Sequence, residues 1–422
     1  MTIQVAMDSE RLLERFLRYV AVDTTADRQA TTYPSSPGQW TLGRLLTEEL
    51  RAAGVMEVEQ DSKGLVWGLI PGNQPQDVPV IAFNAHFDTS PETTGADVKP
   101  QVIRNYGGGD IVLPGDRSKV IRVAENPELT KLVGKTLVTT DGTTLLGGDD
   151  KAGMAVITEL AAMLSQHPEI PHGPIRILFT CDEEIGHGVD HVDLSKLAAD
   201  VGYTLDGGGA GEIDVETFSA DMATIDFHGV NIHPSIAKGR MVNAIRMAAD
   251  FVSRLPRKEC SPETTDGRQG FLHPFEIRGG VQHATLEVLL RDFETARLGE
   301  QSDLLRSIAS DVQREFSGSR IEVKIVQQYR NLGDGLAKEP RAAALAERAH
   351  QNLSLASKRS IIRGGTDGSL LTARGLPTPN LSTGQHNPHS PLEWVCLEEM
   401  SQAVAVLVEL VQLWSRESKR SN

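Results

Sequence analysis

Two adjacent aspartates, Asp149 and Asp150, stand between two glycines and a lysine in the segment LLGGDDKAG. The leucines before them look like the end of a buried run, and the residues after them read as the start of a helix. A helix N-terminus needs one carboxylate to accept hydrogen bonds from its free N–H groups. The second carboxylate needs another purpose, and the candidates are a phosphate partner, a metal ion and plain exposure to solvent.

Four more motifs with polar side chains fall at the ends of expected strands: AHFDTSP, TCDEEIG, YTLDGGG and GQHNPHSPLEW. They supply the candidate residues His86, Asp88, Glu183, Glu184, Asp206, His386 and His389. Ligands of an open α/β sheet bind outside the carboxyl ends of its strands, so these side chains are expected to converge. Imidazole nitrogens and carboxylate oxygens together suit zinc or a similar divalent ion. One aspartate of the pair would then bind metal while its neighbour caps or orients.

Each motif also has an ordinary structural explanation when it is taken alone. A His-x-Asp pair is usually a surface pair, two aspartates before a helix more often both cap it, and adjacent glutamates usually lie in a solvated loop. Cys181 is expected to be a buried thiol and not a ligand. The five motifs all end buried strands, however, and this coincidence favours a metal site. The spacing does not tell how many metal ions it holds.

The composition limits the class of protein. A chain of 422 residues is expected to form at least two domains. Its net charge of −15 argues against nucleic acid or an anionic membrane as the main partner. The N-terminal segment is charged and amphipathic, unlike a signal peptide, and no apolar run approaches the ~18 residues of a membrane span. Three cysteines cannot all pair. We therefore expect a cytoplasmic protein.

Strand and helix patterns alternate in the first half of the chain, which predicts an α/β fold with a mixed, mostly parallel sheet between helices. The apolar run at 174–181 is typical of a strand buried on both faces. The expected strands lie at 64–71, 78–86, 174–181 and 201–209, and the expected helices at 10–20, 40–53, 151–165, 193–199 and 397–414.

A second pattern occupies the middle of the chain. Residues 212–229 alternate apolar and polar side chains, which predicts an antiparallel strand pair. Expected helices at 239–254 and 295–315, a loop at 256–270, and strands at 281–293 and 320–329 complete a small α+β domain. Because the α/β pattern then resumes, we expect a larger domain of residues 1–215 and 328–422 with residues 216–327 inserted into it.

The motifs together resemble the peptidase T family of tripeptide aminopeptidases, within the superfamily of zinc aminopeptidases, carboxypeptidases and aminoacylases. The likeness runs nearly end to end, from LLERFLRYVAVDT to the last helix, and includes HFDTSP, DEEIGHG, TLDGGG, HPSIAKGRMVNA and LLRDF. TTDGTTLLG-DDKAG and IRGGTDG are narrower signatures of this family. Departures are Phe87, where valine is common, and the segments GQHNPH and SPLEW around His389.

The resemblance implies a site with two zinc ions. His86 and Asp206 would bind one ion, Glu184 and His389 the other, and Asp149 would bridge both. Glu183 would be the general base, and Asp88 would orient the His86 ring. Relatives have a cis peptide after the bridging aspartate, so a cis Asp149–Asp150 bond is expected.

The resemblance also implies roles for residues of the inserted domain, which would serve as a lid and dimerisation domain. His233 would stabilise the oxyanion, reaching the site of a partner subunit in a homodimer. Arg291, Asn243 and Arg363 would hold carboxylate or carbonyl groups of the substrate. His233 is also compatible with an ordinary loop histidine, and Arg291 with a strand-edge charge.

The implied function is a cytoplasmic dizinc aminopeptidase that releases the N-terminal residue from tripeptides, using a hydroxide shared by the ions and Glu183 as base. One alternative is a related metal-dependent amidohydrolase, such as an aminoacylase, dipeptidase or carboxypeptidase. Another is a non-catalytic metal-binding scaffold, which would have no need of Glu183. Short peptides are the expected partners, and neither nucleic acid nor a membrane is expected.

Overall fold

A computed structural model describes residues 3, 5, 7–74 and 77–419. The chain divides into two compact units. The large unit comprises Met1–Val215, Gly335–Ser360 and Thr366–Asn422, and the inserted unit comprises Glu216–Asp334 and Ile361–Gly365.

The sequence places the insertion at 216–327, and the compact unit runs from Glu216 past this range to Asp334. Asn331 explains this extension. Its side-chain oxygen accepts from the backbone N–H of Thr217 at 3.1 Å, and its own N–H donates to Ser219 Oγ at 2.9 Å. These bonds fasten the end of the insertion to its beginning.

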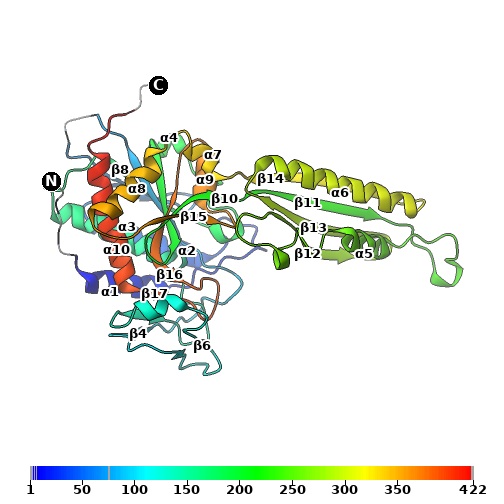
Figure 1. Cartoon of the computed structure of the whole chain (residues 1–422), viewed down its shortest axis with the longest axis horizontal. Helices are drawn as coiled ribbons and strands as arrows, with labels where there is room; N and C mark the ends of the chain where they lie inside the picture. Colours follow the sequence, from blue (N-terminus) through cyan, green and yellow to red (C-terminus); the bar gives the residue numbers. More distant parts are fainter. Residues whose placement is uncertain (1–2, 4, 6, 75–76, 420–422) are drawn as a thin grey trace. The chain divides into compact units, whose positions relative to one another are not determined.

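The large unit contains one mixed sheet with the strand order β1-β2-β8-β3-β9-β16-β17-β7-β4. Strand β10 pairs with β16 and also with β15, which extends the sheet (Figure 1). The central strands β8, β3, β9 and β16 run parallel, and the outer pairs are antiparallel. This arrangement confirms the expected α/β class. The strands are β1 (Met56–Gln60), β2 (Val66–Ile70), β3 (Ile81–His86), β4 (Gln101–Ile103), β7 (Leu137–Thr139), β8 (Ile175–Thr180), β9 (Val201–Gly208), β10 (Glu212–Thr217), β15 (Lys358–Ile362), β16 (Asn380–His386) and β17 (Trp394–Cys396).

Helices pack against this sheet, most closely α3 on β3 and β9 and α10 on β16. Almost every residue of α3 is buried, as is typical of a helix covered on all sides. The helices of the large unit are α1 (Ser9–Val20), α2 (Pro37–Ala52), α3 (Gly148–Gln166), α4 (Leu194–Leu197), α8 (Arg341–Asn352), α9 (Asp367–Ala373) and α10 (Leu397–Trp414), and α7 (Leu332–Leu336) spans the point where the chain passes from the inserted unit to the large one. A separate small ribbon consists of β5 (Ile111–Val112) and β6 (Val120–Ile121).

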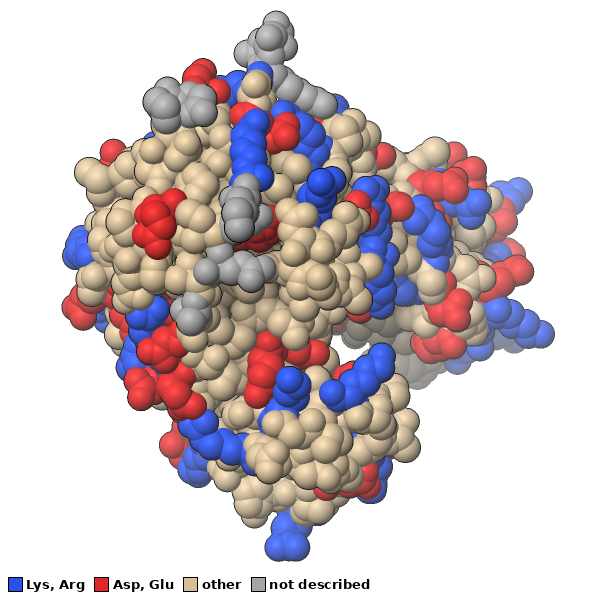
Figure 2. All heavy atoms as spheres, turned by 60° about the vertical axis from the view of Figure 1, so that its left-hand side comes forward, with Lys and Arg blue, Asp and Glu red and all other residues tan. Residues whose placement is uncertain are grey.

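The surface of the chain carries both signs of charge. Figure 2 shows Lys and Arg interspersed with Asp and Glu over the face that it presents. No helix among the described residues is long and apolar enough to cross a membrane.

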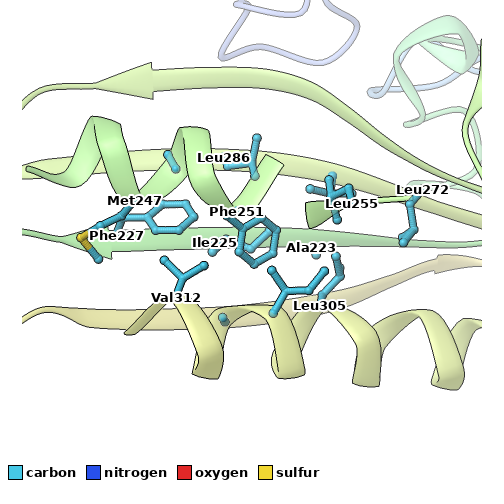
Figure 3. Close-up of a cluster of buried hydrophobic side chains, with 14 of the residues drawn as sticks. Ala223, Ile225, Phe227, Met247, Phe251, Leu255, Leu272, Leu286, Leu305 and Val312 are labelled. Carbon is cyan, nitrogen blue, oxygen red and sulfur yellow. The ribbon is translucent and has the colours of Figure 1, made fainter. Parts of the chain in front are cut away.

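The inserted unit is an antiparallel sheet with the order β12-β13-β11-β14, covered on one face by α5 and α6. Alternate residues of β11, such as Ile225 and Phe227, pack under these helices against Phe251, Leu305 and Val312 (Figure 3). Period-two alternation puts the intervening residues on the other face. The elements are β11 (Ser219–His228), β12 (Phe271–Gly279), β13 (His283–Asp292), β14 (Arg320–Tyr329), α5 (Ala244–Arg254) and α6 (Thr295–Glu315).

Three expectations for this region were wrong. Residues 212–229 form two strands of different sheets, because β10 pairs with β15 and β16 while β11 pairs with β13 and β14. Strand β12 was not expected; Pro274 lies in it, and it is an edge strand, where proline is tolerated. Helix α5 begins at Ala244 and not at 239, since the Asn243 side chain caps it by accepting from Ile245 N–H.

Candidate metal centre

Five ligand-type side chains meet at the carboxyl edge of the parallel strands. His86 is the last residue of β3, and Asp206 lies near the end of β9. Glu184 follows β8 in a short 3-10 turn, Asp149 lies at the start of α3, and His389 follows β16. Since β8, β3, β9 and β16 are parallel neighbours, their ends share one edge of the sheet. This is the convergence that the sequence motifs predicted.

Asp149 occupies the centre of the group. Its Oδ1 lies 3.0 Å from His86 Nε2, and its Oδ2 lies 3.3 Å from His389 Nε2. His389 Nε2 is also 2.9 Å from Glu184 Oε2, and His86 Nε2 is 3.8 Å from Asp206 Oδ1. The five side chains are thus arranged as two histidine–carboxylate sets with Asp149 between them.

The two aspartates have different neighbours. The Asp149–Asp150 peptide bond is cis, as expected. Asp150 is fully buried; its Oδ1 accepts from Gly153 N–H at 3.1 Å, and its Oδ2 accepts from His86 N–H at 3.3 Å. Asp150 therefore caps α3 and braces the backbone of His86, while Asp149 presents both oxygens to imidazoles. This division answers why the sequence needs two carboxylates here.

Asp88 joins His86 to the acidic pair. Its Oδ1 accepts from Glu183 N–H and its Oδ2 from Glu184 N–H, both at 3.0 Å. Its Oδ1 also lies 3.5 Å from His86 Nδ1, and its backbone carbonyl oxygen is 3.1 Å from the same nitrogen. Asp88 thus fixes the ring of one candidate ligand and the backbone of the segment that carries Glu183 and Glu184.

Burial and neighbouring charges shift the pKa values of these groups. Burial raises the pKa of Glu183 well above its usual value, and it raises the pKa values of Glu184 and Asp206 to about 7. Burial also opposes ionisation of Asp149, but hydrogen bonds from His389 and His86 outweigh it and hold its pKa below the usual range. When these buried carboxylates are ionised they repel one another, unless bound cations compensate their negative charge.

The arrangement fits a bound divalent cation. His86, Asp149 and Glu184 each offer one ligand atom within 4.8 Å of the others, and so do His86, Asp150 and Asp206. Glu184 Oε1 is buried and has no hydrogen-bond partner among the described residues. A buried carboxylate oxygen without a partner is costly, and a bound cation would satisfy this oxygen. The mixed nitrogen and oxygen donor set suits zinc and similar ions.

The structure also shows a residue that the sequence did not single out. Glu393 is 1% exposed, and it accepts backbone N–H bonds from Leu146, Gly147 and Asp149 at 2.7, 2.8 and 3.0 Å. It therefore holds the turn that presents Asp149. A lone carboxylate between Leu392 and Trp394 was the available signal, because an acidic residue in an apolar segment is buried only when it is well bonded.

Asp367, in the IRGGTDG motif, is a second buried carboxylate beside the site. Its Oδ2 accepts from Thr180 Oγ1 at 2.5 Å, at the end of β8. A Cβ atom at Gly188 would lie 1.9 Å from Asp367 Oδ1. The loop after the acidic pair therefore needs glycine to pack against this carboxylate.

His386 and Cys181 are not among the converging groups. His386 stacks on Trp394 with ring centroids 3.8 Å apart, and its Nε2 is 2.7 Å from Glu399 Oε2. Cys181 is a buried free thiol, as expected.

The four remaining candidates lie in the inserted unit and have partners within it. The His233 ring accepts from Ser235 N–H, and Asn243 caps α5. Arg291 donates to the carbonyl oxygens of Asp221 and Leu290. Arg363 donates to the carbonyl oxygens of Gly267 and Gln269 and lies over the rings of Phe218 and Phe271. Hydrogen bonds within the inserted unit therefore explain the presence of Asn243, Arg291 and Arg363. Of the four residues, His233 is the least constrained by such bonds.

Comparison with known proteins places these features in a family. The family model "Peptidase family M20/M25/M40" matches residues 140–413. The chain is 44% identical to peptidase T of Geobacillus sp. over 407 residues, covering 96% of this chain and 99% of that one. It is 43% identical to peptidase T of Listeria monocytogenes over 405 residues, covering 96% and 98% of the two chains.

Solved structures show the same fold. A crystal structure of aminopeptidase PepT from Bacillus cereus aligns with TM-score 0.74 at 23% identity, covering 97% of this chain and 100% of that one. A tripeptidase from Staphylococcus aureus aligns with TM-score 0.76 at 24% identity and the same coverage. A Bacillus subtilis protein described as a dinuclear metal binding peptidase of the M20 family aligns with TM-score 0.63 at 17% identity, covering 96% of this chain and 98% of that one.

Proposed function

The chain belongs to the peptidase T family within the M20 peptidases, and from this membership we propose that it is an aminopeptidase that removes the N-terminal residue from tripeptides. The family resemblance that the motifs indicated is thereby confirmed. The observation that carries the proposal is the convergence of His86, Asp149, Glu184, Asp206 and His389 beside Glu183. The name of the Staphylococcus aureus protein, a tripeptidase, supports the substrate class.

Two zinc ions per chain are part of the proposal. His86 and Asp206 would hold one ion, Glu184 and His389 the other, and Asp149 would hold both, since its two oxygens point to different histidines. The dinuclear Bacillus subtilis relative supports the number of ions, and the nitrogen and oxygen donors support zinc. When bound, such a pair of ions polarises the scissile carbonyl and acidifies water.

Glu183 would carry the proton transfers. It lies beside the ligand set without belonging to it, and burial raises the pKa of its carboxyl group, as is typical of a general base. It would take a proton from the attacking water and deliver it to the departing amine. Asp88 would keep Glu183 in place through the backbone bond to Glu183 N–H. Asp88 is therefore a positioning residue in this proposal.

The inserted unit would serve as a lid and dimerisation domain. His233 would donate to the oxyanion in the site of a partner subunit, because its ring is exposed and, among the described residues, is hydrogen-bonded to the neighbouring Ser235 alone. To bind substrate, Asn243, Arg291 and Arg363 would each have to keep or exchange the local bonds described above. The homodimer itself rests on the family resemblance.

A cytoplasmic location is also proposed. Its support is that Cys181, Cys260 and Cys396 are all free thiols, as is usual in a reducing compartment.

A substrate panel tests the function. Purified protein with added zinc should hydrolyse Ala-Ala-Ala faster than Ala-Ala, and it should leave N-acetylalanine intact. Release of the N-terminal residue is followed by chromatography of the products. Preference for the acetylated amino acid would indicate an aminoacylase, preference for Ala-Ala a dipeptidase, and release of the C-terminal residue a carboxypeptidase. Metal binding without any hydrolysis would indicate a scaffold.

A further inference from the structure

The open face of the inserted unit's sheet carries a second group of metal-ligand side chains. Strand β11 points Ile225 and Phe227 toward the helices (Figure 3), so the alternate residues Asp226 and His228 face away from the apolar core. On the neighbouring strands, His283 is paired directly opposite His228, and Glu322 directly opposite Asp226. We call Asp226, His228, His283 and Glu322 the sheet-face cluster.

The cluster is already compact. The rings of His228 and His283 have centroids 5.0 Å apart. His283 Nε2 is 2.9 Å from Asp226 Oδ1, and His228 Nε2 is 3.7 Å from Glu322 Oε2. Directly opposed residues of an antiparallel pair have Cβ atoms about 4.5–5.5 Å apart, which places two side chains within reach of one ion. The backbone register therefore fixes the two imidazoles side by side.

One nitrogen of this cluster lacks a partner. His228 Nε2 is shielded from solvent, and it has no hydrogen-bond partner within the part of the chain that the structure describes. Its separation of 3.7 Å from Glu322 Oε2 is too long for a hydrogen bond. Ion pairs explain the contact of His283 with Asp226 and the 3.7 Å approach of His228 to Glu322, but they leave His228 Nε2 without a hydrogen bond. A ligand between the side chains would explain both.

We propose that the sheet-face cluster binds one divalent cation of the zinc class, separately from the candidate metal centre of the large unit. Ligand atoms about 2.0–2.1 Å from a tetrahedral zinc ion lie roughly 3.3–3.4 Å from one another. The nitrogen–oxygen separation is 2.9 Å within the His283–Asp226 pair and 3.7 Å within the His228–Glu322 pair, and these values lie on either side of that spacing. Two imidazoles with two carboxylates select zinc, nickel or copper over magnesium or calcium, which prefer oxygen alone.

Neighbouring groups orient the carboxylates. Thr285 Oγ1 donates to Asp226 Oδ1 at 2.8 Å. Arg320 holds the other oxygen of Glu322, with its NH1 2.6 Å from Oε1, and this leaves Oε2 toward His228. The positive charge of Arg320 opposes a bound cation, so the two histidines and Asp226 carry most of the affinity. Outer partners of this kind are usual around metal ligands.

Zinc counting on the full chain tests the site. Metal-free protein is titrated with Zn²⁺ in competition with a chromophoric chelator, and bound zinc per chain is compared among variants. We expect the wild type to bind one zinc more than His228→Gln and one more than His283→Gln. His273→Gln, which changes a histidine of the same sheet outside the cluster, should keep the wild-type number.

The test compares the number of bound zinc ions in each variant with that in the wild type, so it does not depend on how many ions the large unit holds. Tripeptide hydrolysis measured on the same samples tests the proposed function separately. Asp226→Asn, a nearly isosteric change, should weaken the additional zinc by at least about 100-fold. Equal zinc numbers in the wild type and both cluster variants would overturn the proposal. An equal loss in His273→Gln would also overturn it, because the additional zinc would then be bound without regard to this cluster.

Discussion

The two units each gather histidines and carboxylates, but most of those in the large unit are more deeply buried than those in the inserted unit. In the large unit, the side chains of His86 and Asp88 are 3% and 0% exposed. In the inserted unit, those of His283 and Asp226 are 47% and 32% exposed. A buried ionised group loses its hydration and needs a partner, whereas an exposed group remains solvated when no ligand is bound. Both groups contain the same residue types, so burial is the difference between them. We therefore expect the group in the large unit to need a bound metal ion more than the group in the inserted unit does.

Catalysis provides the largest expected contrast. Glu183→Gln should leave the two proposed metal ions bound and reduce tripeptide hydrolysis by roughly 10²–10⁴-fold, because the proposed proton carrier is lost. Glu184→Gln should instead weaken one metal ion, since the Oε2 oxygen beside His389 is a proposed ligand. Metal analysis and steady-state rates distinguish the two variants. Glu48→Gln, on the exposed surface of α2, is the control. Equal metal loss in the two variants would reverse or remove the roles assigned to this pair.

A catalytic role of His233 would reduce this contrast between the units, because a residue of the inserted unit would then take part in peptide hydrolysis. His233→Ala should lower kcat by about 10²–10³-fold, the usual effect of losing one oxyanion donor, with unchanged metal content. Mixing it with Asp149→Ala should restore part of the activity if subunits exchange, because one hybrid site would contain both residues. If verified hybrids remain inactive, His233 acts within its own chain or has no catalytic role.

The variant Glu393→Gln tests whether metal binding needs the buried hydrogen bonds that hold the turn of Asp149. Glu393→Gln places an amide donor against backbone N–H groups, so it should cost about 1–3 kcal/mol of folding free energy. Metal affinity should fall by roughly 10–100-fold, as is typical when a supporting residue is lost. Glu398→Gln is the matched control, since Glu398 accepts from Thr136 N–H without contacting the aspartate turn. Chemical denaturation and metal competition measure both effects. Unchanged metal affinity in Glu393→Gln would restrict Glu393 to a structural role.

The smallest expected effect is a pH dependence of the metal-free protein. Burial raises the pKa values of Asp206 and Glu184 to about 7, so between about pH 4 and pH 7 the folded state binds more protons than the unfolded state. The stability that these two groups contribute is complete below their unfolded pKa values and is lost as the pH rises through 7. Thermal unfolding of chelated protein should therefore show a Tm that decreases over this range, relative to the zinc-loaded protein. A constant difference between the two forms would contradict the assigned burial.

The sequence predicted β2, β3, β8 and β9 of the large unit, and it left β1, β16 and β17 of that unit and β12 of the inserted unit unrecognised. Buried parallel strands such as 174–181 are continuous apolar runs, and the acidic motifs mark their ends, so the positions of His86, Glu184 and Asp206 followed from local patterns. In the inserted unit, β12 contains Pro274 and ends in exposed residues, which hides its period-two pattern. Local composition alone could not reveal it.

Local sequence patterns could not identify contacts between residues that lie far apart in the chain. Glu393 acts on Leu146 and Asp149, about 250 residues earlier in the chain, and nothing in SPLEW specifies those partners. The sheet-face cluster likewise depends on the register that joins β11 to β13 and β14. The two strands at 212–229 have the same alternation, but only pairing with other strands assigned them to different sheets. Local sequence specifies an element, and tertiary pairing specifies its neighbours.

The position of β16 in the large sheet has a consequence for synthesis on the ribosome. β16 lies between β9 and β17, yet Asn380 is translated 172 residues after Gly208. At about 5–20 residues per second, β9 waits roughly 10–30 s for its neighbour. During that interval β9 presents an unpaired edge that other nascent chains can join. Slower translation at lower temperature prolongs this interval, so it should lower the soluble yield unless a chaperone covers the open edge.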